Sequence, residues 1–365
     1  TPEHLAVARE AVAKSLVLLK NNGSVLPIKP GARVLVTGPA ADSMAIQSGG
    51  WTISWQGTDV THADFPNGQT IWEALNKSVR DAGGVATLSD GGVYKEKPDV
   101  AIVVFGEAPY AEFQGDVATL DYQPSEATDL ATLKKLKVAG IPVVALFLSG
   151  RPMFTNPEIN AADAFVAGWL PGSQGAGVAD VLVAGKDGKT MRGFTGTLPF
   201  AWPADARSPV EKLQFAVGYG LKYGANTTVP QLSEELGVDI AAALNVENYF
   251  SGGRARAPWV LTVTDAGGSR PVESPPMSSP GGLIAARSVD VRAQEDGKSF
   301  VWTGPAALHL SGPYADLSRQ LNNSFALRVD WRVDAIGSAP VTLALGGKVF
   351  DISAAVKAAP KGQVS

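Results

Sequence analysis

The sequence has no cysteine and only three histidines, His4, His62 and His309, which lie far apart in the chain. Without cysteine, disulfides and zinc–thiolate sites are excluded. The scarcity of histidine, with no H-E-x-x-H motif and no G-x-S-x-G nucleophile elbow, argues against a zinc hydrolase or a histidine-dependent triad. Carboxylates and aromatic rings are the remaining chemistry, and this pair suits glycoside hydrolysis. No metal and no cofactor is expected.

Excess positive charge and long apolar runs are also missing. The formal net charge is −4 and no long basic run occurs, which argues against electrostatic binding of nucleic acid. No window approaches the roughly eighteen apolar residues of a membrane span. No G-x-G-x-x-G follows the first predicted strand, so a dinucleotide site is not indicated. A cysteine-free chain suits the bacterial periplasm or exterior, although such chains also occur in the cytosol.

The first 225 of the 365 residues alternate between short apolar runs and amphipathic segments. This pattern predicts a doubly wound, mostly parallel sheet, that is, an α/β sandwich. The predicted strands are 32–38, 85–88, 100–105, 142–148 and 164–167. The predicted helices are 4–20, 72–81, 125–139, where Ser125 is the expected N-cap, and 176–184.

The loop 106–116 is the first candidate site. It follows the buried strand 100–105, and Pro109 prevents that strand from continuing. Loops at the carboxyl ends of parallel strands are where α/β proteins bind and react. The loop carries three carboxylates and two aromatic rings, which are Glu107, Glu112, Asp116, Tyr110 and Phe113. One hypothesis is a proton donor at a sugar-cleaving site, and the alternative is a solvated acidic loop.

A second aromatic stretch, 49–57, places Trp51 and Trp55 between glycines in a non-periodic segment. Indole rings stack on the apolar faces of sugars, and flanking glycines let a ligand approach the backbone. The alternative is that both rings are buried packing residues, since tryptophan is usually mostly buried.

Residues 1–225 resemble the second domain of glycoside hydrolase family 3, the family of β-glucosidases and exo-1,3/1,4-β-glucanases. The matching stretches are 8–21, 36–39, 49–57, 104–112, 148–152, 169–175, 196–199 and 215–223.

The resemblance implies a division of labour between two domains. In the family, a preceding (β/α) barrel carries the nucleophilic aspartate, and the second domain lends the acid/base glutamate from a loop. By position, Glu112 matches the acid/base, and Glu107 is the second candidate for that role. Trp51 matches a tryptophan of the family that holds the next sugar. Further candidate sugar contacts are Trp55, Tyr110 and Phe113. No barrel is recognisable in this chain. We therefore expect that the chain supplies the acid/base but not the nucleophile, and that alone it is inactive.

Composition changes after residues 226–230, which are predicted to be a linker. Short strands predicted at 259–264, 289–293, 299–302, 306–310, 325–334, 341–345 and 349–352 indicate a β-sandwich or jelly roll over 231–365. An Asp296–Gly297 turn is expected between the second and third of these. The domain resembles the extra C-terminal domain of some bacterial exo-β-glucanases, which is similar to carbohydrate-binding jelly rolls, and its end could be truncated. Either glycan binding or a structural role is open to it; Trp331 is expected in its core.

Three functions compete at this stage. The first is a fragment of a retaining exo-acting β-glucosidase or β-glucan glucohydrolase, with β-glucan or an oligosaccharide as substrate and a barrel domain as partner. The second is a non-catalytic carbohydrate-binding or scaffold protein. The third is a β-xylosidase, which the 49–57 stretch favours less because it looks more like the glucanase branch.

Overall fold

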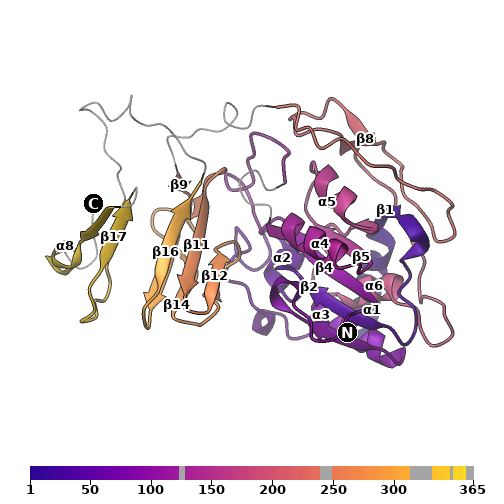
Figure 1. The fold of residues 1–365 in the computed structure, drawn as a ribbon, viewed down its shortest axis with the longest axis horizontal. Coiled ribbons are helices and arrows are strands. Elements are labelled where there is room, and N and C mark those ends of the chain that lie inside the picture. The colour runs from indigo at the N-terminus through magenta and orange to yellow at the C-terminus, as the bar shows by residue number, and fades with distance from the viewer. Residues whose placement is uncertain (123–127, 239–248, 313–330, 346–347, 359–365) are drawn as a thin grey trace. The chain divides into compact units, whose positions relative to one another are not determined.

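The computed structural model describes residues 1–122, 128–238, 249–312, 331–345 and 348–358. Two compact units are present, Thr1–Pro313 and Tyr314–Ser365. The first contains a six-stranded sheet flanked by helices, followed by smaller antiparallel sheets (Figure 1). An α/β part followed by a β domain is therefore confirmed as the fold class.

The large sheet has the order β1-β6-β5-β4-β2-β3. All neighbours are parallel except β1, which pairs antiparallel with β6 at one edge. Its strands are β1 (Val17–Asn21), β2 (Arg33–Thr37), β3 (Val85–Leu88), β4 (Val100–Gly106), β5 (Val143–Leu148) and β6 (Ala164–Ala167). The helices are α1 (Pro2–Ser15), α2 (Met44–Ser48), α3 (Ile71–Asp81), α4 (Thr128–Val138), α5 (Asn156–Ala161) and α6 (Ala176–Leu182).

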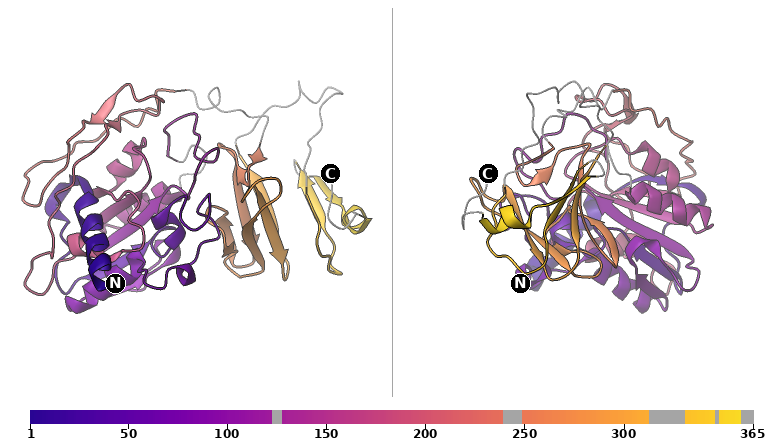
Figure 2. Two further views of the ribbon diagram at one scale, coloured as in Figure 1. Left: turned by 180° about the vertical axis from the view of Figure 1, so that it is seen from behind. Right: turned by 60° about the vertical axis from the view of Figure 1, so that its left-hand side comes forward.

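Each face of this sheet has its own apolar core, because side chains alternate along a strand. Along β4, Ile102 and Val104 join the core formed with α1, α3 and α6. Val103 and Phe105 face the opposite core, formed with α4 and α5. The sheet consequently lies between helices, as Figures 1 and 2 show. Within the described residues, no helix has both the length and the apolarity needed to cross a bilayer.

The predicted helix 4–20 is wrong in its last residues, since α1 ends at Ser15 and β1 begins at Val17. Leu18 packs into one core, while Val17 and Leu19 pack into the other. Leu16 to Leu19 form an unbroken apolar run, which suits a strand buried on both faces better than an amphipathic helix. The expected N-cap Ser125 lies outside the described residues.

Strand pairs and small sheets follow the large sheet. A short pair is formed by β7 (Trp202–Pro203) and β8 (Leu213–Phe215), and another by β9 (Phe250–Ser251) and β10 (Arg254–Ala255). Two three-stranded sheets follow. One has the order β12 (Gly268–Pro271), β11 (Val260–Asp265), β16 (Ala307–Ser311). The other has the order β13 (Met277–Ser278), β14 (Ile284–Val289), β15 (Gly297–Trp302). Buried residues alternate along β11 and β14, as expected for strands with one face in a core.

The expected strand 289–293 is displaced, because β14 ends at Val289 and residues 290–296 form a loop rather than a two-residue turn. Asp296 accepts backbone hydrogen bonds from Val291, Arg292 and Ala293, and these bonds hold the segment out of the ladder.

In the second unit, β17 (Thr342–Leu345) pairs with β18 (Lys348–Asp351), and α8 (Ser353–Ala358) follows. Most of the predicted strand 325–334 lies outside the described residues. Trp331 is 38% exposed, so the expectation that it is a core residue is wrong.

Candidate active site

The sheet has a topological switch point between β2 and β4. These strands are parallel neighbours, but the chain continues from β2 to β3 on one side and from β4 to β5 on the other. In open α/β sheets, such a point leaves a crevice at the carboxyl ends of the two strands. The segment after β2 carries Trp51 and Trp55, and the segment after β4 carries Glu112. Both sequence-predicted stretches therefore belong to this end of the sheet.

The two loops are in backbone contact at Gly50. A Cβ added there would lie 2.0 Å from the carbonyl oxygen of Tyr110, so only glycine permits this approach. Trp51, Ile53 and Phe113 have φ values of 58°, 67° and 69°. Left-handed backbone costs energy for large or β-branched side chains and is found mainly where function requires it. The loops thus hold exposed apolar residues in strained conformations; Trp51 and Phe113 are each 70% exposed.

Both tryptophans donate hydrogen bonds to Glu112. The Nε1 atom of Trp55 lies 2.6 Å from Oε2 of Glu112. The Nε1 atom of Trp51 lies 3.3 and 3.2 Å from Oε1 and Oε2. The Glu112 side chain is otherwise exposed to solvent. Hydrogen bonds to the carboxylate favour its charged form, so the Trp55 N–H, with a smaller contribution from Trp51, holds the pKa of Glu112 below its ordinary value.

Gln56 fixes the backbone on which Glu112 stands. Its Oε1 accepts from the N–H of Ala111 at 2.8 Å, and its Nε2 donates to the carbonyl of Glu112 at 3.0 Å. Gln56 is only 1% exposed, so water competes little for these bonds. Gln56 is not among the site residues predicted from the sequence, although it lies within the 49–57 stretch.

Glu107 occupies a different environment. Its carboxylate binds the guanidinium of Arg151, with Nη2 2.6 Å and Nε 3.0 Å from Oε1, and accepts from Ser149 Oγ at 2.6 Å. The side chains of Glu107 and Arg151 are 11% and 23% exposed. A paired carboxylate with several hydrogen bonds is held in place and is not free to reach a ligand.

The remaining predicted residues divide between surface and interior. The Trp55 ring lies 6.4 Å from that of Trp51 and 5.9 Å from that of Phe113, measured between centroids, which makes one aromatic group around Glu112. Tyr110 is half-buried, with the Arg151 guanidinium carbon 4.4 Å from its ring centroid. Burial raises the pKa of Tyr110 above its ordinary value. Asp116 is exposed at the end of the loop.

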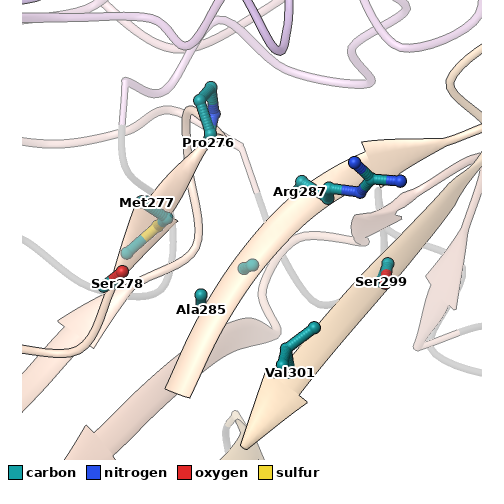
Figure 3. Close-up of a pocket in the computed structure, with 8 residues that line it drawn as sticks. Pro276, Met277, Ser278, Ala285, Arg287, Ser299 and Val301 are labelled. Atoms are coloured by element: carbon teal, nitrogen blue, oxygen red, sulfur yellow. The ribbon is translucent and has the colours of Figure 1, made fainter. Parts of the chain in front are cut away.

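A separate shallow pocket lies on β13, β14 and β15 (Figure 3). It has a volume of about 280 Å³, and Met277, Arg287 and Val301 are among the eight residues that line it. The lining contains neither a carboxylate nor an aromatic ring, so it offers no acid/base group and no platform on which a sugar could stack.

Exchanging Gly50 for alanine tests the contact between the two loops. We expect Gly50→Ala to lower the free energy of unfolding by about 1–3 kcal/mol, because the new Cβ must displace the Tyr110 carbonyl. The matched control is Gly193→Ala, since an added Cβ there meets no atom within 4 Å. Urea unfolding followed by circular dichroism measures both. Equal stability of the two variants would contradict the close approach.

Removing the indole donor tests the electrostatics of Glu112. Trp55→Phe should raise the pKa of Glu112 towards its ordinary value, because the charged form loses its strongest hydrogen bond. Trp51→Phe should raise it less, and Trp302→Phe, on β15, should leave it unchanged. NMR titration of the ¹³C-labelled Glu112 carboxyl measures the pKa. An unaltered value in Trp55→Phe would refute this assignment.

Comparisons with known proteins agree with the architecture. The model of the glycosyl hydrolase family 3 C-terminal domain matches residues 16–223. A model described as galactose-binding domain-like matches residues 257–365.

Solved structures of an exo-1,3/1,4-beta-glucanase from a Pseudoalteromonas species are similar to this chain. One is 46% identical and covers 85% of this chain and 39% of its own, with a TM-score of 0.63. A mutant form is 54% identical over 65% of this chain and 39% of its own, also with a TM-score of 0.63.

Curated relatives include a lysosomal beta glucosidase of Dictyostelium discoideum, 31% identical over 219 residues, which are 53% of this chain and 26% of the relative. The periplasmic beta-glucosidase of Salmonella typhimurium is 29% identical over 226 residues, 55% of this chain and 28% of the relative. This chain thus spans between a quarter and two fifths of these relatives' lengths. The resemblance predicted from the sequence is confirmed: the chain belongs to glycosyl hydrolase family 3, of which it carries the C-terminal domain.

Proposed function

We propose that this chain is part of a retaining, exo-acting β-glucosidase or β-glucan glucohydrolase that removes terminal β-linked glucose, and that Glu112 is its acid/base. One observation supports the proposal: two tryptophan N–H groups hold an exposed carboxylate on the loops that follow β2 and β4. The nucleophile comes from a barrel domain outside these 365 residues, as the resemblance implies. The names of the relatives, a glucanase and two glucosidases, support this substrate class.

Glu112 suits the proton-transfer role better than Glu107. A general acid must lie within hydrogen-bond distance of the glycosidic oxygen, which requires a carboxyl that faces outward from its own domain. Glu112 is exposed, whereas Glu107 is bound by Arg151 and Ser149. The ion pair instead gives Glu107 a structural role, since Arg151 Nη1 also donates to the carbonyl of Gly115 at 2.6 Å and so holds the loop.

The pKa of Glu112 adds a requirement to the proposal. A carboxyl whose pKa is lowered is ionised at neutral pH and cannot protonate a leaving group. Covering by a second domain and by the sugar removes water from the carboxyl, and desolvation raises its pKa. The tryptophan bonds oppose this rise, and they favour the ionised base that the second, hydrolytic step of a retaining mechanism uses. The tryptophan bonds thus support the base step, and the acid step depends on the desolvation that the second domain and the sugar provide.

Trp51 is proposed as the sugar contact. Its ring is 70% exposed, although its N–H is bound to Glu112. A ring that is anchored at its nitrogen presents a fixed apolar face, which can stack on a pyranose without losing much side-chain entropy. Trp55, Tyr110 and Phe113 complete the proposed set of sugar contacts. Phe113 is exposed, whereas Tyr110 is half-buried and packs against Arg151.

We further propose a division of the chain into an α/β domain over 1–225, a linker over 226–230 and a β domain over 231–365. The location proposed is periplasmic or extracellular, which the periplasmic relative supports.

Replacing Glu112 tests the assignment in the protein that carries this chain after its barrel. Glu112→Ala should reduce hydrolysis of an aryl β-glucoside with a poor leaving group by about 10²–10⁴-fold, because general acid catalysis is lost. With a good leaving group such as dinitrophenol, which departs without a proton, added azide should restore part of the turnover and yield the β-glucosyl azide, since the small anion attacks the glycosyl-enzyme without a general base. Glu235→Ala, at an exposed carboxylate, is the control.

A near-normal rate of aryl β-glucoside hydrolysis in Glu112→Ala would contradict the assignment of Glu112 as the acid/base and would favour Glu107 in its place. Binding of oligosaccharide by a wild-type protein without any turnover would instead favour the non-catalytic alternative.

A further inference from the structure

We propose that Glu295, which lies in the loop between β14 and β15, is a positioning residue for the acid/base Glu112. It fixes the 54–58 segment and, through Gln56, the backbone at Glu112. Three hydrogen bonds join Glu295 to that segment. Oε2 accepts from the backbone N–H of Gln56 at 2.7 Å, and Oε1 accepts from the hydroxyls of Ser54, at 3.1 Å, and Thr58. This inference rests on the proposed role of Glu112.

The carboxylate of Glu295 is deeply buried, since the residue is 5% exposed. Burying a charge is costly unless hydrogen bonds replace its water shell, and the three donors of the 54–58 segment provide this replacement. The segment depends on Glu295 in turn. Without the carboxylate, the backbone N–H of buried Gln56 would lose its hydrogen-bond partner. Buried groups with such matched partners hold one geometry firmly.

The loop that carries Glu295 is itself rigidly built. Asp290 Oδ1 accepts from the N–H of Glu295 at 2.7 Å, and Asp296 binds three backbone N–H groups of the same loop. Glu295 has a φ of 58°, a left-handed conformation that is unfavourable for glutamate. Strain of this kind persists only where the surroundings fix it, and here it directs the side chain into the 54–58 segment.

The connection from Glu295 to the acid/base has two steps. Glu295 holds the backbone of Gln56, and the side-chain amide of Gln56 binds the N–H of Ala111 and the carbonyl of Glu112. Trp55, which donates to the Glu112 carboxylate, lies between Ser54 and Gln56 and is fixed by the same contact. Both the backbone and the carboxylate of Glu112 therefore depend on one buried side chain that lies 239 residues from Gln56 in sequence.

The segment of β9 and β10 contacts the loop 106–116. Gln114 Nε2 donates to the carbonyl of Gly252 at 2.5 Å, and Arg254 donates to the carbonyl of Pro109. These bonds lie on either side of Glu112 in sequence, so both loops of the crevice are tied to the segments around Gly252 and Glu295. Loss of Glu295 should therefore weaken the contact of Gln56 with Ala111 and Glu112 without unfolding the large sheet.

Hydrogen exchange of the 365-residue chain tests the positioning without any enzyme assay. In Glu295→Gln, which keeps the side-chain size, and in Glu295→Ala, amides of peptides covering 54–58 and 110–114 should exchange about tenfold faster or more, because local opening becomes easier. Peptides from β4 should exchange as in the wild type, which excludes global unfolding. Glu235→Gln is the matched control. Unchanged exchange at 110–114 in both Glu295 variants would overturn the proposal.

The barrel-containing protein supplies the functional test. A misplaced acid slows only those reactions that need a proton on the leaving group, so Glu295→Gln should lower kcat/KM for a disaccharide about tenfold or more, and for dinitrophenyl β-glucoside much less. An equal loss for both substrates means a merely structural role and overturns the proposal. If instead faster exchange at 110–114 accompanies unchanged kinetics, the contact exists but Glu112 is not the acid/base, which contradicts the proposed function.

Discussion

The contact of buried Gln56 with the backbone at Ala111 and Glu112 is the interaction on which the site depends. It joins the segment after β2 to the segment after β4, which the sheet topology brings to one edge but does not by itself hold together. Once the two loops are joined, the Trp51 and Trp55 nitrogens meet the Glu112 carboxylate. A flexible surface glutamate thereby becomes an oriented one, at the cost of left-handed backbone at Trp51 and Phe113.

Two carboxylates of one loop have different surroundings. Glu107 is adjacent to the strand end and finds Arg151 and Ser149 at the end of the neighbouring strand, so it stabilises the loop. Glu112 is farther along the loop, accepts hydrogen bonds from the N–H groups of Trp51 and Trp55, and keeps its exposure. The separation of a structural from a chemically available carboxylate follows from how far each stands from the sheet.

Sequence reasoning identifies five of the six strands of the large sheet and four of the six helices around it, because buried strands are short apolar runs and most of the helices are amphipathic. It assigned Leu16 to Leu19 to a helix because steps of three and four also fit there, and only the two cores on either side of β1 show otherwise. It selected Trp51 and Glu112 separately, but not their contact, since a hydrogen bond between two loops leaves no periodic trace. Gln56 and Glu295 escaped notice for the same reason: each is a single polar residue whose partners lie far away in sequence.

We infer that Glu112, oriented by its tryptophan partners, donates the proton to a glucoside held against a second domain. A crystal structure of the barrel-containing protein with an unhydrolysed thio-linked disaccharide tests it most directly. We predict a Glu112 carboxyl oxygen within about 4 Å of the bridging sulfur, the hydrogen-bond distance for that larger atom, and about 5–5.5 Å between the Glu112 carboxyl and the nucleophilic carboxyl. Glu107 in that position, or Glu112 turned away from the sugar, would contradict it.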